Sequence, residues 1–415
     1  EERFLFFEFS KYKERYCTVE GITDTYAFHA DFEVQECYRQ TNKETIMNIA
    51  LIIFPIHASH GCILQTFALA TTLRQMGHKV TIIDRQWDKL SYLRVCLHAA
   101  KIVAKKIVCG YEGGLTISVE NKLIMSELQT FIDRYLHDRV ISYSTPSYTK
   151  LKDFDAFIVG SDQTWRPKYV SDATYYYLGF IPSNAKVKRV AYAPSFGTEE
   201  WEYSPELTET CKELIQRFDA VSVREESGIK LCKVHYNIEA THVLDPTMLL
   251  HKEDYLSACG LELRNDSELS YYLLDSSDEK MAIVNKVCTD LNLRKNRINT
   301  DTENSKASLH KRIAPSIEKW IGGFAHSKFI VADSFHATVF AILFNKPFIT
   351  IANKERGLAR FMSLLQMVGL ENRLVFDSKE VDDNLITSTI EWNEVNKRLA
   401  NKRTESLTFL KNSLA

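Results

Sequence analysis

The chain lacks the features that mark several common classes of protein. Its nine cysteines, scattered through 415 residues, include no CxxC pair and no metal-ligand spacing, so the sequence indicates neither a disulfide framework nor a zinc module. No apolar run approaches the about 20 residues of a membrane span, and the first residues lack the basic, apolar and small-residue order of a signal peptide. We therefore expect a cytoplasmic protein in a reducing environment.

A strong excess of charge is also missing. The 52 Lys and Arg residues against 54 Asp and Glu residues give a formal net charge of -2, without the basic field that non-specific nucleic-acid binding requires. The sequence has no HExxH, GxSxG or P-loop motif, and a single glycine, Gly61, stands in the first loop where a dinucleotide site needs several. We therefore expect no metal, no cofactor and no nucleic-acid partner.

What the chain does have is an alternation of apolar strands and helical stretches that starts at Met47. The first strand, helix and strand form a βαβ unit, so their strands are expected to be parallel. The polar stretch 294–311 is predicted to be a loop. The pattern predicts helices at 63–76 and 279–291 and strands at 48–54, 79–84, 156–159, 187–192, 220–223, 241–244, 269–274 and 328–332.

The length suits two domains better than one, because a single hydrophobic core stops growing at roughly 250 to 300 residues. We expect an α/β protein with two Rossmann-like, doubly wound domains that face each other across a cleft. The second set of elements is expected to begin with the strand at Thr241. The expected parts are an N-terminal extension outside the core, an N-terminal domain, a C-terminal domain and a C-terminal helical segment, at 1–46, 47–240, 241–386 and 387–415.

The most informative segment runs from Lys328 to Ile349. A buried-looking strand breaks there at Ser334 and leads into an apolar helix with His336 in its first turn. In open α/β sheets, ligands bind outside the carboxyl ends of the strands, and helix N-termini there attract anions. Ser334 and His336 are therefore candidates for an anion site. The simpler alternative is that Ser334 caps the helix and His336 is an ordinary polar residue.

Polar side chains follow other predicted strands at the same kind of corner. Arg224 ends the strand at 220–223, where it could bind a carboxylate or phosphate, although a surface ion pair with a following glutamate is the simpler interpretation. Six further candidates could contact a sugar or complete the cleft, or could be helix caps, turn residues or surface residues: Ser161, Asp162, Gln163, Ser195, Asp245 and His60.

A basic, apolar stretch at 90–109 contains one arginine, three lysines and no acidic residue. Such a segment could lie on an anionic membrane surface, which would make the protein peripheral at the inner face of the cytoplasmic membrane. The alternative is a partly buried helix whose lysines reach solvent.

Seven segments follow one another along the chain: HGCILQTFALATTLRQMGHKVTIID, DFDAFIVGSDQTW, YAPSFG, AVSVREESG, VLDPTMLL, PSIEKW and VADSFHATVFAILFNKPFI. In this order they resemble the polysaccharide pyruvyl transferase family, from about Met47 to about Phe376. The resemblance implies two Rossmann-like domains of the glycosyltransferase-B type. It also implies transfer of the pyruvyl group of phosphoenolpyruvate to sugar hydroxyls, with formation of a ketal, during bacterial surface polysaccharide synthesis.

The resemblance assigns roles to some of the candidates. His336 matches the histidine implicated in catalysis, and Arg224 matches an arginine expected to bind the anionic donor, beside Ser334. The chain departs from the family at Ala337, where glycine is usual, and in the first loop, which reads Ser-His-Gly-Cys from Ser59. The implied partners are phosphoenolpyruvate and a glycan or lipid-linked oligosaccharide acceptor. A nucleotide-sugar-dependent glycosyltransferase and a non-catalytic glycan-binding protein are the alternative functions.

Overall fold

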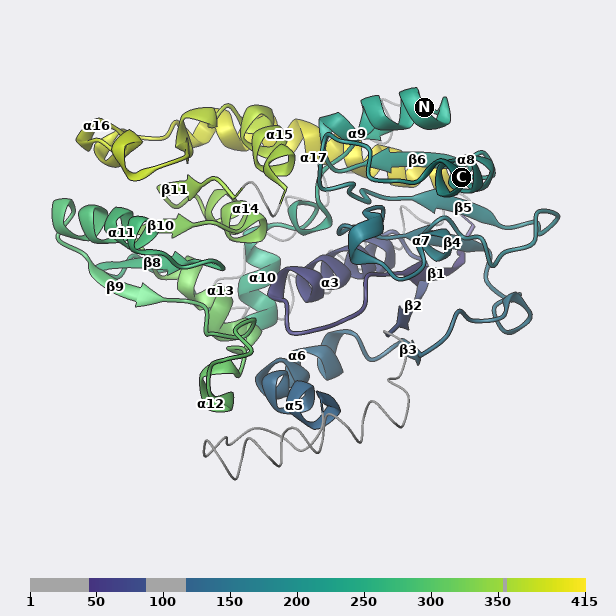
Figure 1. Cartoon of the computed structure of the whole chain (residues 1–415), viewed down its shortest axis with the longest axis horizontal. Coiled ribbons are helices and arrows are strands. Elements are labelled where there is room, and N and C mark those ends of the chain that lie inside the picture. The colour runs from purple at the N-terminus through teal and green to yellow at the C-terminus, as the bar shows by residue number, and fades with distance from the viewer. Residues whose placement is uncertain (1–44, 87–116, 354–356) are drawn as a thin grey trace, which may run out of the picture. The chain divides into compact units, whose positions relative to one another are not determined.

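The computed structural model describes residues 45–86, 117–353 and 357–415. Met47–Leu414 form one compact unit, and within its described residues lie two parallel β-sheets (Figure 1). The predicted N-terminal extension, 1–46, lies almost wholly outside the described residues, and the basic stretch 90–109 lies entirely outside them. Both therefore stay predictions, as do the boundaries of the predicted domains.

In the described residues, the first sheet has seven parallel strands in the order β3-β2-β1-β4-β5-β6-β7. They are β1 (Asn48–Ile52), β2 (Lys79–Arg85), β3 (Arg139–Ser142), β4 (Ala156–Val159), β5 (Lys188–Ala191), β6 (Ala220–Val223) and β7 (Thr241–His242). The strand order reverses between β1 and β4. In a doubly wound sheet this reversal, the topological switch point, opens a crevice at the carboxyl ends of the strands.

The second sheet, counted over the same described ranges, has five parallel strands in the order β12-β11-β10-β8-β9. They are β8 (Glu268–Tyr272), β9 (Arg294–Arg297), β10 (Phe329–Ala332), β11 (Phe348–Ile351) and β12 (Leu374–Val375). Its switch point lies between β8 and β10. The predicted α/β fold with two parallel, doubly wound sheets is confirmed.

The helices connect the strands and cover the sheets (Figure 1). The α-helices are α3 (His60–Gln75), α5 (Ile117–Ile124), α6 (Ser126–Tyr135), α7 (Ala173–Tyr176), α8 (Pro205–Ile215), α9 (Glu226–Leu231), α10 (Lys252–Cys259), α11 (Asp278–Asp290), α12 (Leu309–Arg312), α13 (Ile317–Ala325), α14 (Phe335–Leu343), α15 (Leu358–Val368), α16 (Asp383–Thr387) and α17 (Trp392–Leu414). Shorter 3-10 turns include η2 (Pro167–Tyr169) and η4 (Pro246–Met248).

Helices α3 and α14 matter most for the site, because each follows a strand at a switch point. Both are buried along nearly their whole length. Helix α14 is apolar on almost every side, as expected for a buried helix, whereas α3 also buries Gln65, Thr66 and Thr72. The Ser59 hydroxyl caps α3 by accepting a hydrogen bond from the Cys62 N–H at 3.4 Å. Helix α14 begins soon after the carboxyl end of β10, and α3 begins after a short loop that follows the carboxyl end of β1.

One hydrophobic core joins elements of both sheets. It contains Ile49 of β1, Ile330 of β10, Phe340 of α14 and Leu410 of α17, each fully buried. The last helix, α17, also returns to the first part of the chain, where Ser406 Oγ accepts a hydrogen bond from the Leu244 N–H at 3.0 Å. None of the described helices is both long enough and apolar enough to cross a membrane.

Two sequence predictions about strands are wrong. The strand at Thr241 does not begin the second set of elements, because β7 pairs with β6 of the first sheet. The stretch 294–311 is not a loop throughout, since β9 pairs with β8 at the edge of the second sheet and α12 follows it. The sequence of β9, Arg-Lys-Asn-Arg, has no apolar alternation because an edge strand of this kind keeps its side chains in water.

Candidate active site

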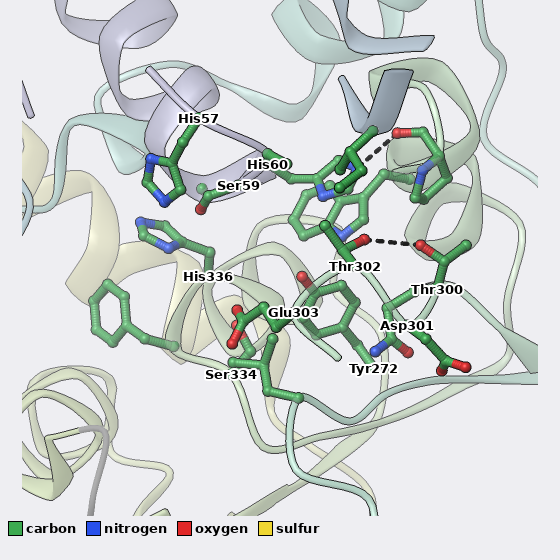
Figure 2. A pocket seen from close by; sticks show the side chains of 18 of the residues that line it. His57, Ser59, His60, Tyr272, Thr300, Asp301, Thr302, Glu303, Ser334 and His336 are labelled. Carbon is green, nitrogen blue, oxygen red and sulfur yellow. Dashed lines mark hydrogen bonds between the residues drawn. The ribbon is translucent and has the colours of Figure 1, made fainter. Parts of the chain in front are cut away.

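A cavity of about 930 Å³ lies where the two switch points meet. Its wall includes the loops that follow β1, β4, β8, β9 and β10, together with residues of helices such as α15. Figure 2 shows His57, Ser59 and His60 of the first loop around the same space as Tyr272, Ser334 and His336 of the second sheet. Ligands bind at such points in α/β proteins, so the topology alone makes this cavity the candidate active site.

The His336 ring is held between a carboxylate and a glycine. Its Nε2 atom lies 3.6 Å from Asp245 Oδ2, and its side chain is 12% exposed. On the other side, a Cβ atom built on Gly61 would lie only 2.1 Å from His336 Nδ1. The single glycine of the first loop therefore makes room for the imidazole, and no larger residue fits there without moving it.

Arg224 and Asp245 form a buried ion pair behind His336. Arg224 Nη1 lies 2.8 Å from Asp245 Oδ2, and each side chain is 1% exposed. The other oxygen, Oδ1, accepts hydrogen bonds from the N–H and hydroxyl of Thr247 at 2.9 and 2.6 Å. Burial alone would raise the pKa of the Asp245 carboxyl, but His336, Arg224 and Thr247 together lower it below its ordinary value. Asp245 is therefore a charged carboxylate against the ring.

The structure thus gives Arg224 and Asp245 positions that the sequence analysis did not foresee. Arg224 makes a buried pair with Asp245, rather than a surface pair with a following glutamate. Neither residue belongs to the wall of the cavity. Arg224 Nη1 also donates a hydrogen bond to Gln65 Oε1 at 3.3 Å, while Nε and Nη2 make no hydrogen bond within the described residues.

The strand-to-helix corner at β10 begins without a side-chain cap. Ser334 is the N-cap residue of α14, but its hydroxyl makes no capping hydrogen bond, so the capping alternative is wrong. Its carbonyl accepts from the Thr338 N–H at 3.0 Å, which starts the helix. Asp333, fully buried, fixes the corner by accepting hydrogen bonds from the Leu274 N–H at 2.6 Å and Lys280 Nζ at 2.7 Å. Ser334 and the first turn of α14 thus face the cavity.

A second arginine, Arg360 of α15, lies in the cavity wall and was not selected from the sequence. It is 7% exposed, and its guanidinium carbon lies 5.4 Å from the centre of the Phe335 ring. The guanidinium carbon of Arg224 lies 4.9 Å from the same ring. Burial, and then the nearby Arg224, lower the pKa of Arg360 to about 10, so it stays charged near neutral pH. The guanidinium groups of two buried arginines therefore lie against the ring of Phe335, the residue before His336.

Two residues of the loop after β4 reach the cavity, namely Asp162 and Gln163. Asp162 has a backbone φ of 96°, in the region that residues other than glycine rarely adopt. Its Oδ1 atom accepts a hydrogen bond from the Gln163 N–H at 2.8 Å. Gln163 Oε1 in turn accepts from Arg166 Nη1 at 3.1 Å.

Two of the three candidate serines, Ser161 and Ser195, do not belong to the cavity wall. Ser195 is fully buried and its hydroxyl donates to Glu225 Oε1 at 3.0 Å, so it fixes the loop after β5. Ser161 is 6% exposed, and among the described residues its hydroxyl has no hydrogen-bond partner. Trp165, in the same loop as Ser161, is a core residue that stacks on Tyr177.

His60 belongs to the wall, but its contacts are structural. Its Nε2 atom lies 2.8 Å from the Pro315 carbonyl oxygen, and its ring stacks on Trp320 with centroids 5.3 Å apart. A carbonyl oxygen only accepts, so Nε2 carries the proton. Burial lowers the pKa of His60 to about 4. The neutral ring ties the first loop to the start of α13.

His57 is a further cavity residue that sequence reasoning missed. Its Nδ1 atom lies 2.8 Å from the Pro55 carbonyl oxygen, which fixes the proton on that nitrogen. Figure 2 shows its ring on the same side of the cavity as that of His336. His57 and His60 lie three residues apart after the same strand, so nothing in the sequence favoured one histidine over the other. Arg360, the other cavity residue that was missed, lies within a helix and away from every strand end.

The fold and the site define an α/β protein whose polar cavity lies between two Rossmann-like sheets. The family model for polysaccharide pyruvyl transferases matches residues 60–355, well over half of the chain. The chain therefore belongs to the polysaccharide pyruvyl transferase family. Membership implies a transferase that acts on a glycan acceptor. No curated protein matches the sequence.

Several solved structures are similar to this chain. Arabidopsis thaliana UGT89C1 complexed with UDP-L-rhamnose is 11% identical, with 89% of this chain and 100% of that chain covered and a TM-score of 0.47. A glycosyltransferase from Rickettsia africae is 11% identical, with 89% and 97% covered and a TM-score of 0.42. An uncharacterized protein from Klebsiella pneumoniae is 12% identical, with 82% and 94% covered and a TM-score of 0.40. These TM-scores are below 0.5, so nothing about those proteins' substrates transfers to this chain.

Proposed function

We propose that this protein transfers the pyruvyl group of phosphoenolpyruvate to two hydroxyls of a sugar, forming a cyclic ketal on a surface polysaccharide or its lipid-linked precursor. The observation that carries the proposal is the position of His336. Its imidazole stands at the cavity wall, backed by a charged carboxylate, and the ring of the preceding Phe335 contacts two buried arginines. A proton-transferring group next to a cationic subsite is what an anionic enol phosphate requires.

The donor would bind at the end of the cavity formed by Arg360, Ser334 and the first turn of α14. Phosphoenolpyruvate combines a phosphate and a carboxylate, and both suit the planar guanidinium group and the free N–H groups of a helix start. Arg360 is in the wall, whereas Arg224 is behind it, so we assign the direct contact to Arg360. Arg224 would attract the anionic donor from behind the cavity wall by its positive charge and would hold Asp245 in place.

His336 would exchange protons with the donor. Asp245 lies on the Nε2 side of the ring, at 3.6 Å, and would hold the imidazole in place. The imidazole can then give a proton to the departing phosphate or to the methylene carbon, and receive one from a sugar hydroxyl. A positioned acid or base of this kind contributes about 10²- to 10⁴-fold to the rate.

The rest of the cavity is much larger than phosphoenolpyruvate and would hold the sugar. Its polar lining includes Asn299, Thr300, Asp301 and Thr302, from the loop after β9. Figure 2 shows this loop across the cavity from His57. Threonine, asparagine and aspartate side chains supply both donors and acceptors for sugar hydroxyls.

The test is to incubate the protein with phosphoenolpyruvate and a panel of methyl hexosides, and to measure phosphate release and the pyruvyl ketal by mass spectrometry. UDP-sugars with the same acceptors form the comparison for a glycosyltransferase. We expect phosphate release and ketal only with phosphoenolpyruvate, and neither with His336→Ala. Release of UDP instead, or full phosphate release by His336→Ala, would contradict the assignment.

A further inference from the structure

We infer that Asp162 is a second catalytic residue, whose carboxylate accepts the proton of the sugar hydroxyl that closes the ketal. The inference rests on the proposed function and adds to it a residue that faces the acceptor. Asp162 lies in the cavity wall directly after β4, on the opposite sheet from His336. Three observations support this role of Asp162: its backbone is strained, one of its two carboxylate oxygens makes no hydrogen bond to a described residue, and it lines the same cavity as the proposed donor subsite.

The backbone of Asp162 is held in an unfavourable conformation. Its φ of 96° is one that glycine adopts without cost and that aspartate and asparagine adopt only occasionally. The conformation is fixed because the Asp162 carbonyl accepts the Ser195 N–H at 2.9 Å and Asp162 bridges to Pro194. Strain of this kind persists where the surroundings enforce it, and it gathers at functional sites. Since glycine would fit better here, the side chain is what the position requires.

The carboxylate of Asp162 is only partly engaged. Oδ1 accepts the Gln163 N–H at 2.8 Å, while Oδ2 makes no hydrogen bond or ion pair with any residue that the structure describes. The residue is partly exposed, toward the cavity. One oxygen therefore keeps its lone pairs for a group that enters the cavity, and an ionised carboxylate can only accept hydrogen bonds.

Asp162 lies close to the proposed donor subsite. It lines the same cavity as Arg360 and His336, and its negative charge acts on the pKa of Arg360. Gly61, which leaves room for the His336 ring, lines this cavity as well. A sugar seated between Asp162 and His336 would therefore have one basic group on each side.

The reaction calls for two proton acceptors. One hydroxyl oxygen bonds to C2 of phosphoenolpyruvate and loses its proton, while C3 takes up a proton and becomes a methyl group. The bond between C2 and the phosphate oxygen then breaks, and its electron pair leaves with the phosphate. The second hydroxyl bonds to the resulting oxocarbenium carbon and loses its proton. His336 exchanges protons with the first hydroxyl and the donor. Asp162 accepts the proton of the second hydroxyl and passes it to phosphate or water.

Two substitutions separate this role from a structural one. Asp162→Asn keeps the size of the side chain and tolerates a positive φ, but it cannot accept a proton. Asp162→Gly relieves the strain and leaves space for a small carboxylate. Asn345→Gly is the matched control, because Asn345 also has a positive φ, of 52°, and lies outside the cavity wall.

We expect wild type and all variants to bind phosphoenolpyruvate with similar affinity in calorimetry. Asp162→Asn should lose about 10²- to 10⁴-fold in kcat, while Asp162→Gly should show an equal or higher Tm, with part of its kcat restored by sodium formate. Asn345→Gly should keep the wild-type kcat. Wild-type kcat in Asp162→Asn, or no effect of formate on Asp162→Gly, overturns the role of Asp162 alone. Absence of phosphoenolpyruvate binding or phosphate release in the wild type overturns the proposed function, and the role of Asp162 with it.

Discussion

Gly61→Ala tests whether the position of the His336 ring is needed for turnover. The new Cβ atom would lie 2.1 Å from Nδ1, 2.6 Å from Cγ and 2.7 Å from Cε1 of that ring, where ordinary contacts start at 3.4 Å. The imidazole must therefore retreat by more than 1 Å. A displacement of about 1 Å of a catalytic group can cost about 10²-fold in rate, which corresponds to about 2.7 kcal/mol of transition-state stabilisation.

The same substitution should change stability much less. Alanine within a helix is better than glycine by about 0.5 to 1 kcal/mol, while an added methyl group in a packed site costs about 1 to 3 kcal/mol. We therefore expect a small decrease in the free energy of unfolding, with a large decrease in kcat for phosphate release from phosphoenolpyruvate.

Gly322→Ala is the matched control for Gly61→Ala. Gly322 is also helical, but the nearest atom to its new Cβ is 3.6 Å away, so it should keep full activity and gain slightly in stability. The measurements are kcat with the best acceptor of the panel and urea unfolding of both variants. A folded Gly61→Ala protein with the wild-type kcat would refute the argument, because it would show that the ring need not stand where Gly61 allows it.

Three further predictions concern the charged groups around the cavity. Arg360→Gln should weaken phosphoenolpyruvate binding in calorimetry by about 10- to 100-fold, since it removes a charge-assisted hydrogen bond. Arg373 is a buried arginine that donates to backbone carbonyls away from the cavity, so the control Arg373→Gln should lower Tm and leave this affinity unchanged. Asp245→Asn should lower the free energy of unfolding by about 3 to 5 kcal/mol, because Arg224 is left buried without its charged partner. Adding Arg224→Met should recover part of that loss. A double variant as unstable as Asp245→Asn would contradict the pairing of the two residues. The folded-state pKa of His60, about 4, is below the ordinary value of about 6.5, so the unfolded chain takes up the proton first as the pH drops. The free energy of unfolding should therefore fall by about 3 kcal/mol between about pH 6.5 and about pH 4. His60→Gln should flatten the dependence of the free energy of unfolding on pH over that window, and an unaltered dependence would count against the burial of this ring.

The sequence was a good guide to the strands because most of them are buried on both faces. Two predicted strands, 156–159 and 220–223, have the bounds that the structure gives to β4 and β6. The sequence failed where burial does not shape the pattern. The edge strand β9 is polar throughout, and β7 is too short for periodicity to show which sheet it joins. Sheet membership depends on tertiary packing, which a local window of sequence does not contain.

The candidate site was predictable to the extent that it lies at strand ends. The strand-end rule found His336, Ser334 and Asp162, all of which are in the cavity wall. The same rule cannot tell a wall residue from one behind the wall, so it treated Arg224 as a ligand when its side chain is paired with Asp245. Arg360 escaped it, because the position of a helical residue relative to a cavity depends on how its helix packs.

The hydrophobic core common to both sheets has a consequence for how this protein can be taken apart. Ile49 and Ile330 belong to different sheets, yet they are fully buried in one cluster that Leu410, near the end of the chain, completes. Cutting the chain between the sheets would expose apolar surface on each fragment, at about 25 cal/mol for every Å². The two halves therefore depend on each other during folding, and the protein should melt in one cooperative transition rather than lose its two sheets in turn.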